Sequence, residues 1–147
     1  MAYTTVVTGR FYNDLIEALR KISTKRGAFR IAMLIPSTAH DSETWNLVVS
    51  AVWLDSMNLR LAVSQVLDSL RQNLSDESFA KVQRVSVLRT GESFVTEATA
   101  DLVTPIELGT AYRVQSFALS RFGVDEAIVL AASPPNPQNL GYRRINA

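Results

Sequence analysis

The segment that decides the fold runs from Trp45 to Leu74 and reads WNLVVSAVWLD followed by SMNLRLAVSQVLDSLRQNL. In its first part, apolar residues occupy both faces of an extended chain, as they do in a buried strand. In its second part, they recur every three or four positions, as on one side of an amphipathic helix. We therefore expect a central strand over residues 45–54 and a long helix over residues 56–73, capped by Asp55 or Ser56.

The preceding segment is expected to supply a helix and a second strand. Residues 10–24 have the same helical spacing of apolar positions, and Gly27 is expected to end this helix in a left-handed conformation. Residues 28–35 are apolar on both faces and predict a strand that Pro36 closes. The polar residues 37–44 then form a loop, and the two strands form a hairpin.

The remaining chain adds shorter elements. Strands are expected over residues 82–88, 106–120 and 124–133, the last two antiparallel, and a helix over residues 93–103. Residues 1–9 form a short edge strand or a loose arm, and residues 133–147 an irregular tail. The predicted fold is a single α+β domain, with a largely antiparallel sheet of about five strands packed against the two main helices, 10–24 and 56–73, plus one or two short helices.

Composition excludes several classes of protein. The chain has 147 residues, enough for one core, and it contains no cysteine, so disulfides, thiolate metal sites and cysteine nucleophiles are excluded. We expect no signal peptide, because the first residues lack a basic stretch followed by a long apolar one, and no apolar run is long enough to span a membrane. We therefore expect a cytoplasmic protein. The glycines are too scattered for a phosphate-binding loop, and we predict neither a cofactor nor a metal ion.

The polar loop holds the chemistry that an enzyme would need. His40 is the only histidine, and it stands beside Asp41 and close to Glu43. A carboxylate next to an imidazole can orient the ring and hold its proton, so these three residues are the first candidates for a catalytic site. An ordinary solvated turn has the same composition, so we do not predict a catalytic residue.

Basic and aromatic residues suggest where a ligand or partner could bind. The most uneven charge feature is a basic cluster between residues 20 and 30, which includes Arg26 and Arg30. Arg113 lies in another expected strand and could anchor an anion. Trp45 and Trp53 are expected on the same face of one strand, in the core or at an interface.

These patterns favour a non-enzymatic function. Because the strands are apolar on both faces and only two long helices are expected to cover them, we predict a small interaction or accessory domain that self-associates or binds a protein partner. One alternative is an enzyme or small-ligand-binding protein with a pocket near loop 37–45. A second is weak nucleic-acid binding through the 20–30 cluster, disfavoured by a net charge of only +1.

Overall fold

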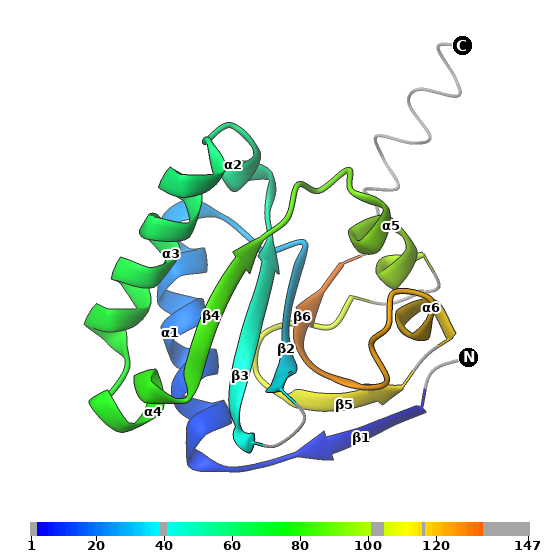
Figure 1. Ribbon diagram of the computed structural model, residues 1–147. Coiled ribbons are helices and arrows are strands. Elements are labelled where there is room, and N and C mark those ends of the chain that lie inside the picture. The colour runs from blue at the N-terminus through cyan, green and yellow to red at the C-terminus, as the bar shows by residue number, and fades with distance from the viewer. Residues whose placement is uncertain (1–2, 39–40, 101–104, 116, 134–147) are drawn as a thin grey trace, which may run out of the picture.

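A mixed six-stranded sheet runs through residues 3–38, 41–100, 105–115 and 117–133, the part of the chain that the computed structural model describes (Figure 1). The strand order is β1-β5-β6-β2-β3-β4, and every neighbouring pair is antiparallel except β3 and β4, which are parallel. The strands are β1 (Tyr3–Val7), β2 (Ile31–Thr38), β3 (Asp41–Ser50), β4 (Val82–Val87), β5 (Ala111–Gln115) and β6 (Ala127–Ala132).

Helices cover both faces of this sheet (Figure 1). The two long helices, α1 (Arg10–Arg26) and α3 (Leu59–Asn73), pack on one face together with the short α4 (Asp76–Ala80). The short helices α5 (Ser93–Thr99) and α6 (Phe117–Ser120) pack on the other face, and α2 (Val52–Asp55) links β3 to α3. The α+β prediction is confirmed, with six strands instead of about five because residues 3–7 form the edge strand β1.

The central strands bury both of their faces, as their apolar composition predicted. In β2, Ala32 and Leu34 pack toward α1 and α3, whereas Ile31 and Met33 pack toward α5 and α6. The same alternation holds in β3, in which the side chain of Val48 packs toward α5 and α6. The core therefore has two layers, one on each side of the sheet.

The predicted strand over residues 45–54 is too long. β3 ends at Ser50, and the chain turns into α2, so Trp53 does not share a strand face with Trp45. Instead the Trp53 ring packs edge-on against Phe29, with 5.9 Å between ring centroids. A short apolar run is compatible with one helical turn as well as with a strand, and only Leu54 of α2 is buried, so the run alone could not show where the strand ends.

The start of the long helix also differs from the prediction. Asn58, and not Asp55 or Ser56, caps α3, because its side-chain oxygen accepts a hydrogen bond from the Leu61 N–H at 2.9 Å. The helix predicted over residues 10–24 extends to Arg26, and Gly27 follows it as the C-cap, as expected. However, Gly27 has φ 128° and ψ 169°, which is not the left-handed helical conformation that we expected.

Pro36 does not close β2, contrary to expectation. The strand continues to Thr38, and Pro36 lies opposite Trp45 in β3. On its other side β2 pairs with β6 only over residues 31–34. Among the described strands, β2 therefore has a neighbour on one side only at Pro36, and there a missing N–H need not cost a ladder bond.

The later elements agree with the prediction in part. β5 and β6 form the expected antiparallel pair, but α6 occupies residues that were expected to extend the first of these strands. α5 confirms the helix over residues 93–99, whereas residues 101–104 and the tail 134–147 lie outside the described residues. None of the helices in the described ranges is long and apolar enough to cross a membrane.

Candidate functional site

A groove separates α1 from α3 on the outside of the molecule. The two helices run antiparallel. Near the end of α1, Arg26 donates to Gln65 of α3 at 2.9 Å. At the other end, Asp14 of α1 accepts from the Ser78 hydroxyl of α4 at 2.8 Å. The groove lies over the last turns of α1 and has a volume of about 610 Å³.

The two walls of this groove differ in chemistry. The wall from α1 is basic, since Lys21 and Lys25 are four residues apart and therefore project from the same side of the helix. The wall from α3 is mainly neutral and polar. The main polar residues lining the groove are Arg20, Lys21, Lys25 and Arg26 from α1 and Gln65, Asp68, Ser69 and Gln72 from α3.

The positive charge of this groove is only partly neutralised. Asp68 is the one acidic residue among the described residues that line it, and it forms an ion pair with Arg71, 3.8 Å away. Lys21 and Lys25 are exposed and form no ion pair within the described ranges. The groove therefore presents cationic groups that are free to meet an anion.

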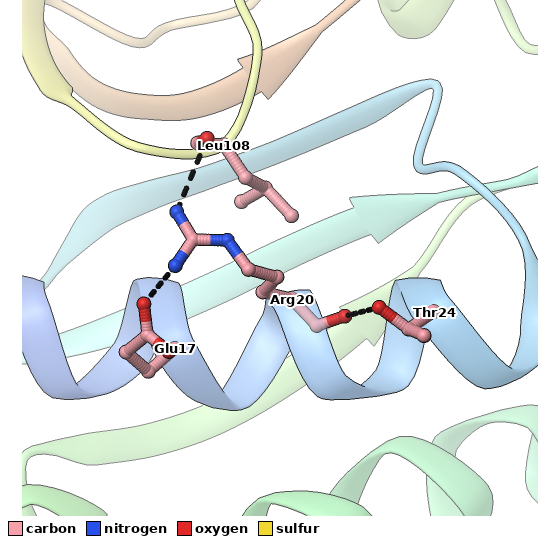
Figure 2. Close-up of polar contacts among 4 residues, drawn as sticks. All are labelled: Glu17, Arg20, Thr24 and Leu108. Atoms are coloured by element: carbon pink, nitrogen blue, oxygen red, sulfur yellow. Dashed lines mark hydrogen bonds and ion pairs between the residues drawn. The ribbon is translucent and has the colours of Figure 1, made fainter.

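Arg20 is the exception, because its guanidinium is already engaged (Figure 2). It contacts the Glu17 carboxylate one turn earlier and donates to the Leu108 carbonyl oxygen at 3.4 Å. The Thr24 hydroxyl in turn donates to the Arg20 carbonyl oxygen at 2.9 Å. Arg20 thus ties α1 to the loop before β5, and it lines both the groove and a smaller cavity of about 320 Å³ beneath that loop.

Arg26, the last residue of α1, also lines the groove. Besides its hydrogen bond to Gln65, its guanidinium carbon lies 6.0 Å from the centroid of the Trp53 ring. The indole N–H of Trp53 donates to the Gly27 carbonyl oxygen at 3.1 Å. The sequence pattern predicts Arg26 as a binding residue but not Gln65, because a glutamine on a solvated helix face gives no signal until the two helices are packed together.

Arg30 belongs to the predicted basic cluster but not to the groove. It lies just before β2 and donates to the Ser133 carbonyl oxygen at 2.9 Å and to the Thr99 hydroxyl at 3.0 Å. Partial burial lowers the pKa of Arg30 below the usual value for arginine, since burial disfavours the charged form. Through these contacts Arg30 connects the end of β6 to α5. Its role among the described residues is therefore structural.

The other two predicted binding residues lie elsewhere. Trp45 packs edge-on against Tyr12, with 6.4 Å between ring centroids, at the far end of α1 from the groove. Arg113 in β5 forms an ion pair with Glu126 at 3.8 Å. The structure therefore does not bring Arg26, Arg30, Trp45 and Arg113 together in one site.

The predicted loop 37–45 is mostly strand. β2 extends to Thr38 and β3 begins at Asp41, so Asp41 and Glu43 belong to the hairpin strands. His40 and the side chains of these two acidic residues lie outside the described part of the structure, and the pocket near this loop stays a prediction. Where side chains are described, no three histidine, aspartate or glutamate residues gather as metal ligands would.

Comparison of the chain with models of protein families, with curated protein sequences and with solved structures finds no match. The groove between α1 and α3 is therefore interpreted from its own geometry and charge.

Proposed function

We propose that the protein is a non-enzymatic interaction domain that binds an acidic protein segment in the α1–α3 groove. The observation that carries this proposal is the pair Lys21 and Lys25, exposed along a groove and without a carboxylate partner in the described residues. Lysines that served only the solubility of the protein would not need to line a groove. A cytoplasmic location is part of the proposal, since a chain without cysteine suits a reducing compartment.

The spacing of the cations suits an extended acidic segment. Side chains four residues apart on a helix have Cβ atoms about 5–6 Å apart. Alternate residues of an extended chain are about 6.6–6.8 Å apart and point to the same side. Two acidic residues separated by one residue could therefore reach Lys21 and Lys25 together.

The opposite wall suits a peptide backbone. Gln72 is exposed and Gln65 is half-buried, and their side-chain amides offer donors and acceptors along the groove. Such groups can hydrogen-bond to main-chain N–H and C=O groups without demanding a particular sequence. The acidic residues would then supply the charge recognition, and the α3 wall would orient the chain.

The groove suits nucleic acid less well. Among the described residues, none that lines the groove is aromatic, so these residues offer single-stranded bases no ring on which to stack. The net charge of +1 also gives little of the long-range attraction that phosphate binding requires. An acidic peptide needs only a few charge contacts and is the better match.

The test is fluorescence anisotropy with a labelled peptide of alternating glutamate and serine. We expect wild-type protein to bind it with an affinity that falls as salt is raised, because exposed charges are screened. The double variant Lys21→Gln and Lys25→Gln should bind about tenfold more weakly, as two exposed ion pairs are lost.

A matched control separates the groove from overall charge. The double variant Arg60→Gln and Arg84→Gln removes the same number of positive charges from exposed positions outside the groove, and it should bind like wild type. The proposal fails if wild type does not bind the peptide, or if both double variants weaken binding equally. Tighter binding of a single-stranded oligonucleotide than of the peptide would instead favour nucleic acid.

A further inference from the structure

The outer edge of β1 is open. β1 pairs with β5 on one side, and no described strand pairs with it on the other (Figure 1). Its sequence, YTTVV, is rich in residues that favour strands and contains no charged residue and no proline. Natural edge strands usually carry charged residues or proline, because these residues block pairing with another chain.

The opposite edge of the same sheet is protected by charge. β4 reads VQRVSV, directly follows Lys81, and has an exposed arginine at position 84. Charged side chains on an edge strand discourage a second strand from adding to it. The contrast within one sheet singles out β1 as the edge that can accept a partner strand.

We propose that β1 pairs antiparallel with β1 of a second copy of this chain, which joins the two sheets into one. For two identical antiparallel strands of five residues, every residue finds a partner only when Thr5 lies opposite Thr5 of the second copy. In this register Val6, which is 59% exposed in the single chain, lies opposite Thr4 of the other copy. No charges of like sign oppose one another between the paired strands.

The association is expected to be weak and reversible. A single pair of short strands buries less surface than the roughly 1,200–2,000 Å² of a stable protein interface. Affinity comes mainly from the main-chain hydrogen bonds, as in other cases of strand addition to a sheet edge. The dimer should therefore dominate only at high protein concentration.

The first test is sedimentation equilibrium of the full chain over a range of concentrations. We expect wild type to show a reversible monomer–dimer equilibrium. The variant Thr5→Glu should dimerise on the order of tenfold more weakly, because it places two carboxylates directly opposite each other. The substitution suits the single chain, since Thr5 is exposed and lies opposite Arg113 of β5.

Two controls test whether the weaker dimerisation depends on the charge itself and on its position in β1. Thr5→Gln has nearly the same shape as Thr5→Glu without the charge, so it should dimerise like wild type. Gln83→Glu places the same charge on β4 and should also leave the dimer intact. The proposal is wrong if wild type stays monomeric at every concentration. It is also wrong if Gln83→Glu weakens the dimer to the same extent as Thr5→Glu.

Cross-linking gives a second test that does not require Thr5→Glu to fold. Because the chain has no cysteine, Thr5→Cys introduces a single thiol, which meets its own copy across the proposed pair. Mild oxidation should convert Thr5→Cys to a covalent dimer several times faster than it converts Gln83→Cys, as non-reducing gel electrophoresis would show. Equal rates for the two variants would refute the pairing through β1.

Discussion

The variant Gly27→Ala should destabilise the protein more than its small size suggests. Gly27 has a φ of 128°, a conformation that residues with a Cβ rarely adopt and that costs roughly 1–3 kcal/mol. A Cβ placed there would lie 3.1 Å from Cδ1 of Trp53. The Trp53 ring cannot easily yield, because its N–H bonds to the Gly27 carbonyl oxygen and its edge packs against Phe29.

Strain and crowding act together at this position, so we expect a loss of about 3 kcal/mol in the free energy of unfolding. For a chain of this length such a loss lowers the melting temperature by about 6–12 °C. Urea denaturation followed by far-UV circular dichroism measures the free energy directly. The Trp53 fluorescence should also change, since the indole must shift to admit the methyl group.

Gly91→Ala is the matched control. In the described part of the chain, no heavy atom lies within 4 Å of a Cβ at Gly91, and Gly91 does not have a positive φ, so we expect alanine to meet neither strain nor contact there. We expect it to be neutral or to stabilise the protein by about 0.4–1 kcal/mol, by restricting the unfolded chain. The reasoning is refuted if Gly27→Ala lies within about 0.5 kcal/mol of wild type, the usual range for an unremarkable surface change.

Three further predictions concern single side chains, each measured by urea denaturation. Ser50→Ala should raise the free energy of unfolding by about 1 kcal/mol, because the buried hydroxyl has no hydrogen-bond partner among the described residues; a loss of stability would show that it has one. Asn58→Ala should cost about 1 kcal/mol through loss of the α3 N-cap, whereas Asn58→Asp should retain the cap and most of the stability. Asp55→Ala should cost about 1–3 kcal/mol, because its carboxylate accepts hydrogen bonds from the Thr90 N–H at 3.0 Å and the Thr90 hydroxyl at 2.5 Å; an unchanged urea midpoint would contradict this.

The sequence predicted the elements whose pattern depends on burial alone. In α1 the fully buried residues Leu15 and Leu19 are one helical turn apart, and they produce the periodic signal that identified the helix. β2 and β3 are buried on both faces, so their continuous apolar runs were also informative. In both cases the local pattern and the tertiary environment require the same residues.

The prediction failed where tertiary contacts select between two locally acceptable structures. Val52 is 75% exposed in α2, although the strand prediction treated the whole run to Leu54 as buried. Trp53 turns out of the strand direction because Phe29 and Gly27 offer it a ring contact and a hydrogen-bond acceptor. Neither residue is near Trp53 in sequence, so the pattern of residues 45–54 could not reveal this.

The candidate groove was half predictable for the same reason. The cations near the end of α1 form a charge cluster in the sequence, and this cluster predicts Arg26 as a binding residue. The α3 wall appears only when the antiparallel packing of the helices brings Gln65 beside Arg26. Arg30, a member of the same cluster, is directed to the other side of the sheet, where its guanidinium donates to the Thr99 hydroxyl of α5.

The groove and the β1 edge lie far enough apart to be tested in one molecule. β1 is at the opposite edge of the sheet from β4, against which α3 packs, and the groove lies over the last turns of α1 and not over the first turns that follow β1. A dimer paired through β1 would therefore present two open grooves. A probe with two acidic segments on a flexible linker should bind the dimer more tightly than a probe with one, because the second contact is intramolecular. Thr5→Glu should abolish that advantage and leave single-segment binding unchanged, whereas Lys21→Gln with Lys25→Gln should weaken both probes.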